Sequence, residues 1–157
     1  MLKEIRQNAG ITIEEASKIV GVPFRTYYRY EQNENYGNAL KRSMIEKILQ
    51  NEFEITETKG ILTIEKIKML LYEVFSKKEN DVEFCFLFGS YAKGYAKENS
   101  DVDLCVSTSL KGLDFVGLIE EIRQKLHKEI HLLRFGDLAN QQELLKEILK
   151  DGIKIYG

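Results

Sequence analysis

The feature that most constrains the fold is an apolar run that ends in Gly-Ser and is followed ten residues later by two aspartates. The run VEFCFLF leads into Gly89 and Ser90, and Asp101 and Asp103 introduce a second apolar run. Both runs are short and rich in aromatic or β-branched residues, so each predicts a strand. A strand that turns at Gly-Ser into a helix presents free backbone amides, which an anion can approach closely at glycine. The pattern therefore predicts a phosphate-binding turn beside a sheet.

The two aspartates indicate a metal site. Asp101 and Asp103 are two residues apart on the predicted strand, so both carboxylates are expected on one face of the sheet. Adjacent carboxylates repel each other unless a cation lies between them, and hard oxygen ligands favour Mg²⁺. Together with a phosphate-binding turn, such a site indicates a nucleoside triphosphate and chemistry at phosphorus. The alternative is a surface turn with two solvated acids, which either motif alone would favour.

Composition excludes several other classes. The chain has 157 residues, of which 43% are hydrophobic, and a net charge of -2, which predicts a folded core and no overall attraction to nucleic acid or membrane. No apolar run approaches the roughly 20 residues of a membrane span, and the N-terminus lacks the apolar core of a signal peptide. We therefore expect a cytoplasmic protein. Cys85 and Cys105 lie in predicted core strands without metal-ligand spacing, which favours buried, reduced thiols.

Helical and strand signals alternate in residues 59–157. Predicted helices begin at Thr63, at Asp114 and near Asn140, and the predicted strands are VEFCFLF, DVDLCVS, EIHLLRF and a short closing run, IKIY. The pattern indicates a small α/β or α+β sandwich with helices against a three- or four-stranded sheet. Because the N-terminal part shows no convincing strand, we predict the α+β class.

Residues 1–58 are predicted to be an all-helical domain. Thr12 and Glu15 form a capping box that opens the second helix, and Gly21 ends it. The third helix is PFRTYYRYE, and the segment NEFEITETKG resembles a polar linker. A fourth helix is predicted over residues 38–50. Its apolar residues, expected to face inward, are Leu40, Met44, Ile45, Ile48 and Leu49.

The motif Gly89-Ser90, ten residues, Asp101-Val102-Asp103 resembles the signature of the DNA polymerase beta nucleotidyltransferase superfamily. The size of residues 59–157 resembles its minimal nucleotidyltransferase (MNT) branch. The resemblance implies transfer of a nucleoside monophosphate from a triphosphate such as ATP to an acceptor, with Asp101 and Asp103 holding two Mg²⁺ ions. The nucleotide-binding residues that it implies are Gly89, Ser90, Lys93, Gly94 and Ser100, and Lys97 could also neutralise phosphate charge.

The sequence departs from the family at the third carboxylate, which usually lies on a neighbouring strand. The matching stretch here is Ile130-His131-Leu132, and imidazole is a poor Mg²⁺ ligand. His131 could be a catalytic base that deprotonates an acceptor hydroxyl, or it could mark a weakened or lost activity. The register of this strand could also differ, and Glu129, two residues earlier, could serve as the ligand instead.

The segment LKEIRQNAGITIEEASKIVGVPFRTYYRYEQNE resembles the XRE/Cro-type helix-turn-helix. In that fold the third helix enters the major groove and its first residues contact base edges. The DNA-binding residues that this implies are Phe24, Arg25, Thr26, Tyr28 and Arg29. Residues 1–58 carry eight Lys or Arg and nine Glu, so we expect weak DNA binding unless the protein dimerises. The alternative is a module for dimerisation or partner docking.

Together the two resemblances indicate the antitoxin of a HEPN/MNT toxin–antitoxin pair. In such pairs the MNT protein transfers AMP to a tyrosine of the HEPN ribonuclease toxin and silences it. The helix-turn-helix would then bind operator DNA and repress its own operon, and we expect a homodimer or hetero-oligomer. The alternative is a transcription regulator whose nucleotidyltransferase domain only binds nucleotide or a partner. A third interpretation, transfer to a small molecule such as an antibiotic, lacks an extra domain to hold that substrate.

Overall fold

The computed structural model describes residues 1–157, and the chain divides into two compact units, Met1–Glu54 and Ile55–Gly157. Each unit has a hydrophobic core of its own. None of the helices combines the length and the apolar character that a bilayer crossing would require.

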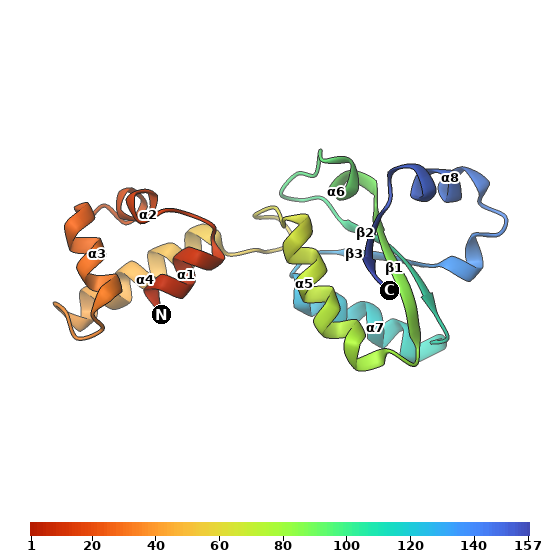
Figure 1. Ribbon diagram of the computed structural model, residues 1–157, viewed down its shortest axis with the longest axis horizontal. Helices are drawn as coiled ribbons and strands as arrows, with labels where there is room; N and C mark the ends of the chain where they lie inside the picture. The colour runs from red at the N-terminus through yellow and green to blue at the C-terminus, as the bar shows by residue number, and fades with distance from the viewer. The chain divides into compact units, whose positions relative to one another are not determined.

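The N-terminal unit consists of four helices (Figure 1). They are α1 (Leu2–Asn8), α2 (Ile13–Val20), α3 (Phe24–Gln32) and α4 (Ala39–Phe53). The predicted capping box opens α2: the Thr12 amide donates to the Glu15 carboxylate at 2.8 Å, and the Glu15 amide donates to the Thr12 hydroxyl at 3.2 Å. Gly21 ends α2 in the left-handed conformation, at φ 68°. The local signals therefore place the turn between α2 and α3 as predicted.

A buried ion pair joins α1 to α3. The guanidinium of Arg6 donates two hydrogen bonds to the carboxylate of Glu31, at 2.7 and 2.9 Å. The Glu31 side chain is 0% exposed and the Arg6 side chain 13%. Arg6 also donates to the carbonyl of Ile11 at 3.0 Å, which ties the turn after α1 to the same group. Because neither charge can reach bulk water freely, each depends on the other.

We predict that Arg6→Met unfolds the N-terminal unit more easily, because it leaves the buried Glu31 carboxylate without its partner. The expected loss is about 3 kcal/mol in the free energy of unfolding, measured by urea denaturation followed by circular dichroism. Lys18→Met is the matched control, since Lys18 forms an exposed pair with Glu14 and should unfold like the unmodified protein. An equal effect of the two substitutions would show that the buried ion pair of Arg6 and Glu31 does not stabilise the unit more than an exposed pair does.

The prediction for α4 was partly wrong. Ile45 and Leu49 are buried, but Leu40, Met44 and Ile48 are exposed, at 71%, 56% and 40%. Residues four apart stay on one face of a helix, and the core of this unit accepts only the face that carries Ile45 and Leu49. The other three residues form an exposed apolar stripe beside the buried face of the helix.

The C-terminal unit is built on a four-stranded sheet, which confirms the predicted α+β class and the closing strand. The strands are β1 (Val82–Phe88), β2 (Val102–Thr108), β3 (Ile130–Arg134) and β4 (Ile153–Tyr156), in the order β3-β2-β1-β4. β1 runs antiparallel to β2 and β4, and β2 runs parallel to β3. The helices are α5 (Ile64–Phe75), α6 (Gly89–Lys93), α7 (Gly112–Leu126) and α8 (Gln142–Asp151), with short 3₁₀ segments at Ser76–Lys78 and Phe135–Leu138.

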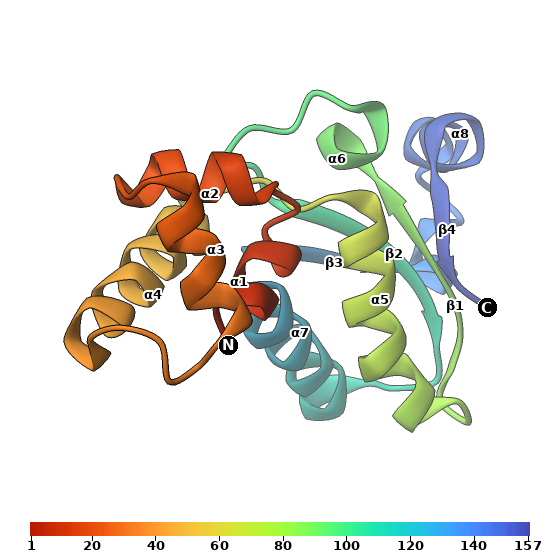
Figure 2. The same ribbon diagram turned by 60° about the vertical axis from the view of Figure 1, so that its left-hand side comes forward.

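Helices α5 and α7 cover one face of this sheet and α8 covers the other (Figures 1 and 2). Along β2, Val102, Leu104 and Val106 join the core beneath α5 and α7, whereas Cys105 packs in the smaller cluster beneath α8. Asp103 alternates with the first set, so it lies on the face of α8. The predicted cap at Asp114 is absent: α7 begins at Gly112 after Lys111 without a side-chain cap, and Asp114 lies in its first turn.

Candidate active site

The site begins where β1 ends beside β2. Phe88, the last residue of β1, pairs with Asp103 of β2, so Gly89 follows directly beside the Asp103 carboxylate. Gly89 has φ 69°, and a Cβ atom placed on it would lie 3.0 Å from Cγ of Asp103 and closer still to Oδ2. Both the left-handed backbone and the contact with Asp103 therefore require glycine at this position.

We predict that Gly89→Ala disables the site, whereas Gly94→Ala does not. Both glycines have positive φ, 69° and 84°, but a Cβ atom at Gly94 would meet nothing within 4 Å. Each alanine should cost about 1–2 kcal/mol of backbone strain, and only the alanine at position 89 should displace Asp103.

The measurements are melting temperature and nucleotidyl transfer. The two variants should melt alike, while transfer should fall about 10²-fold in Gly89→Ala only, because the carboxylate is misplaced. Equal transfer by the two variants would show that the contact between Gly89 and Asp103 has no role in the reaction.

His131 lies beside Asp103 from the neighbouring strand. The parallel register pairs the two residues, and Nδ1 of His131 is 3.0 Å from Oδ1 of Asp103. An ionised carboxylate only accepts hydrogen bonds, so Nδ1 is the donor and carries the proton. The His131 side chain is 58% exposed and that of Asp103 23%, so Nε2, the second ring nitrogen, belongs to an exposed side chain.

Asp103 has an unusual electrostatic environment. Burial raises its pKa, the hydrogen bond and charge of His131 lower it, and the charges of Asp101 and Glu147 raise it again; the net pKa lies above the ordinary 3.8. Burial is thus the main cause of the raised pKa, and Asp101 and Glu147 add smaller contributions of the same sign. Asp101 itself is exposed and precedes β2, which begins at Val102. The strand is thus one residue shorter than predicted at this end.

Lys93 and Glu147 join α6 to α8 next to these acids. Nζ of Lys93 lies 2.6 Å from Oε1 of Glu147, and this hydrogen bond raises the pKa of Lys93. The lysine predicted to neutralise phosphate is thus partly neutralised within the protein. Sequence reasoning did not include Glu147, and nothing in the sequence distinguishes it from Glu143, one turn earlier on the same helix.

Ser100 and Lys97 shape the turn that leads to Asp101. The hydroxyl of Ser100 accepts a hydrogen bond from the Lys97 amide at 2.8 Å, and the Ser100 amide donates to the Lys97 carbonyl at 3.0 Å. Gly94 ends α6 in the left-handed conformation, and its amide donates to the Ser90 carbonyl. Ser100 and Gly94, both predicted to bind nucleotide, therefore already serve to shape the loop between α6 and β2.

The donor set fits a magnesium ion that shares its ligands with a nucleotide. No group of three or more His, Cys, Asp or Glu side chains could hold a metal ion alone. Mg²⁺ usually binds one or two carboxylates and completes its shell with water and substrate phosphates. Asp101 and Asp103 are hard oxygen ligands close enough for the charge of one to raise the pKa of the other, so they suit this shared arrangement.

The predicted DNA-binding residues lie together on α3. Phe24, Arg25, Tyr28 and Arg29 are exposed, and Thr26 is half-buried. The rings of Phe24 and Tyr28 stack, with centroids 6.4 Å apart. Tyr27 and Tyr30 pack inward as predicted, so one face of α3 holds the core and the other presents aromatic and basic side chains.

Both parts of the chain match known protein families. Residues 65–157 match the family described as "Polymerase beta, Nucleotidyltransferase", and residues 2–50 match a helix-turn-helix family. The chain belongs to the polymerase beta nucleotidyltransferase family. This confirms the predicted enzyme class and the fused helix-turn-helix.

A curated protein is similar in sequence to the nucleotidyltransferase part of the chain. The provisionally named protein adenylyltransferase MJ0435 of Methanocaldococcus jannaschii is 31% identical over 97 residues, which are 60% of this chain and 99% of the relative. The catalytic unit of this nucleotidyltransferase therefore matches nearly the whole of the archaeal protein.

Solved structures with partial likeness to the nucleotidyltransferase include two toxin–antitoxin complexes. One, with AMP-PNP, is 24% identical, covers 61% of this chain and 74% of the other, and has a TM-score of 0.48. A second, a tri-AMPylated HEPN toxin with its MNT antitoxin from Shewanella oneidensis, is 15% identical, covers 60% and 73%, and has a TM-score of 0.48.

Proposed function

We propose that this nucleotidyltransferase transfers AMP from ATP to a partner protein in a Mg²⁺-dependent reaction and thereby acts as an antitoxin toward a HEPN-type toxin. The observation that carries the proposal is the contact of Gly89 with Asp103, which joins the Gly-Ser turn to the paired aspartates in one site. The archaeal relative named as a protein adenylyltransferase is matched over 99% of its length. A unit of this size is thus compatible with a protein as acceptor. The class of the acceptor comes from the sequence resemblance to HEPN/MNT antitoxins.

The site residues have separate roles in this proposal. Gly89 and Ser90 bind the triphosphate through the turn between β1 and α6, and Asp101 and Asp103 orient it by holding Mg²⁺. A bound Mg²⁺ would neutralise charge on the phosphates and acidify the acceptor hydroxyl. His131 donates through Nδ1 to Asp103, so Nε2 can accept the proton of that hydroxyl. Its 58% exposure leaves it accessible to a protein acceptor.

The helix-turn-helix is proposed to bind operator DNA and repress the operon of the pair. The support is the exposed face of α3, where Arg25 and Arg29 flank the stacked rings of Phe24 and Tyr28. Because the N-terminal part is not basic overall, binding requires a homodimer or a complex with the toxin to double the contacts. Such a repressor and antitoxin would act in the cytoplasm.

We predict that the purified protein, with Mg²⁺ and ATP labelled at the α-phosphate, labels a partner protein in lysate of its host. Asp103→Asn should abolish the label, and His131→Ala should lower the initial rate about 10²-fold, since a general base is lost. Asp137→Asn is the matched control: it makes the same change at an exposed acid paired with Arg134, outside the site.

A second function is favoured by one observation, the imidazole of His131 bound to Asp103 where the family has a carboxylate. In that case the protein is a transcription regulator that binds nucleotide or a partner without transfer. Retained Mg·ATP binding with no label from any of the four nucleoside triphosphates would overturn the transfer proposal and support this one. Recovery of transfer in His131→Asp would then identify His131 as the cause.

For the DNA proposal, we predict that Arg25→Ala weakens binding to the protein's own promoter region by about 1–3 kcal/mol if the contact is bidentate to guanine. Binding to a duplex of unrelated sequence should change little, because it depends on phosphate contacts. Gel-shift titrations at one fixed salt concentration measure both. Unchanged affinity for the promoter DNA would show that Arg25 does not contact its bases.

A further inference from the structure

Lys128 is a charged residue of the catalytic unit that the fold buries completely. It lies between α7 and β3 and is 0% exposed, and desolvation lowers its pKa. The preceding residue, His127, ends α7 in the left-handed conformation at φ 54°. A buried ammonium group is costly unless its hydrogen bonds are satisfied, and none of the roles proposed above uses Lys128.

The ammonium group of Lys128 binds two backbone carbonyls from separate segments. It donates to the carbonyl of Lys59 at 3.2 Å and to that of Glu98. Lys59 belongs to a turn at the start of the C-terminal unit, where the Thr56 amide donates to the same Lys59 carbonyl at 2.9 Å. Glu98 lies in the turn that Ser100 closes immediately before Asp101. One buried charge thus joins residues 56–60 to residues 97–101.

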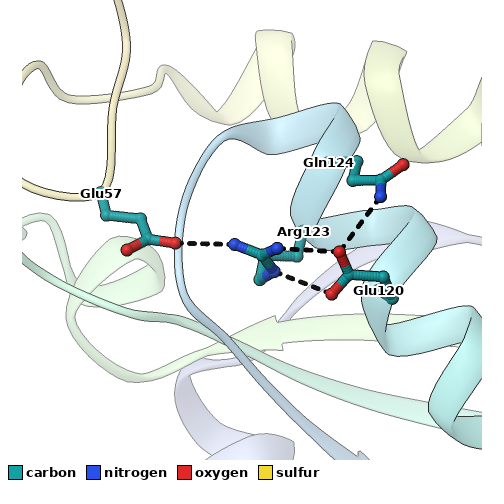
Figure 3. Close-up of polar contacts among 4 residues, drawn as sticks. All are labelled: Glu57, Glu120, Arg123 and Gln124. Atoms are coloured by element: carbon teal, nitrogen blue, oxygen red, sulfur yellow. Dashed lines mark hydrogen bonds and ion pairs between the residues drawn. The ribbon is translucent and has the colours of Figure 1, made fainter.

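Two further contacts strengthen this junction. The amide of Gly60 donates to the carboxylate of Glu98 at 3.3 Å. The guanidinium of Arg123 on α7 donates a hydrogen bond to Glu57 at 2.9 Å. The same guanidinium donates two further hydrogen bonds to Glu120 (Figure 3). Residues 56–60 are therefore fixed to α7 on one side and to the loop before Asp101 on the other.

We infer that Lys128 is a positioning residue for nucleotidyl transfer, which holds residues 56–60 and 97–101 together and thereby places Asp101. The inference rests on the proposed role of Asp101 at the metal. Residues 56–60 are also the chain that enters the catalytic unit from the helix-turn-helix. A change in the conformation of this connecting segment is therefore transmitted to the loop before Asp101.

The first test is Lys128→Met in the full chain, which removes the charge and keeps most of the apolar stem. Hydrogen exchange should become about tenfold faster in residues 56–60 and 97–101 together, because both lose a charged hydrogen-bond donor. Amides shared by β1 and β2 should keep their rates. In transfer assays kcat should fall about tenfold with a nearly unchanged KM for ATP, because the Gly89 turn is untouched. Lys125→Met is the matched control, since Lys125 pairs with Glu73 on the surface.

A second variant decides the question if Lys128→Met does not fold. Glu57→Ala removes an exposed partner of Arg123, and Glu73→Ala is its control, an exposed acid of α5 that pairs with Lys125 on the same helix α7. The inference is supported if hydrogen exchange becomes faster in residues 56–60 and in residues 97–101 in Glu57→Ala, and in neither segment in Glu73→Ala. Acceleration confined to residues 56–60 overturns it, as does uniform acceleration of the whole unit in Lys128→Met. Exchange is measured without nucleotide or acceptor, so failure of the proposed function cannot mimic either result.

Discussion

The catalytic unit depends on the approach of a glycine to a carboxylate at the end of two antiparallel strands. The pairing of Phe88 with Asp103 places the turn at Gly89 against the second aspartate. Any side chain at position 89 would separate the two motifs. This one register therefore brings a segment suited to phosphate and a segment suited to a cation into a single site, which is the requirement for chemistry on a nucleoside triphosphate.

The charges around the site are arranged asymmetrically. Burial is the main cause that raises the pKa of Asp103, His131 lowers it, and Asp101 and Glu147 add smaller increases. Lys93 is paired with Glu147 rather than free. Two neighbouring carboxylates, Asp101 and Asp103, favour a divalent cation, and a metal-bound triphosphate would bring that cation with it. The hydrogen bond to Asp103 engages only Nδ1 of His131, which leaves Nε2 for the proposed role as base for an acceptor hydroxyl.

The two units use buried charge in different ways. In the N-terminal unit, Arg6 and Glu31 neutralise each other and fix α1 to α3. In the catalytic unit, Lys128 has only carbonyl oxygens as hydrogen-bond acceptors, and these come from the entering segment and the loop before Asp101. The first arrangement stabilises a helical unit, while the second joins two segments whose relative position matters for the site. Both the sheet unit and the helical unit retain cores of their own.

The sequence by itself determined the elements whose signals are local. The capping box at Thr12, the strands around the Gly-Ser turn, the closing strand and both families follow from residues that are neighbours along the chain, because turns, caps and periodicity act over a few residues. The spacing of Gly89 and Asp103 also belongs to this group, since one short loop connects them.

Only the tertiary structure decided which distant groups meet. His131 and Asp103 are 28 residues apart, Lys93 and Glu147 are 54 apart, and Lys128 is 69 residues from Lys59. The family resemblance placed His131 on the strand beside the aspartates, but its hydrogen bond to Asp103 and the two lysine contacts depend on strand register and on how helices lie against the sheet. The same reason explains the error in α4: all five apolar residues were expected to face inward, and the core of the unit accepted only Ile45 and Leu49.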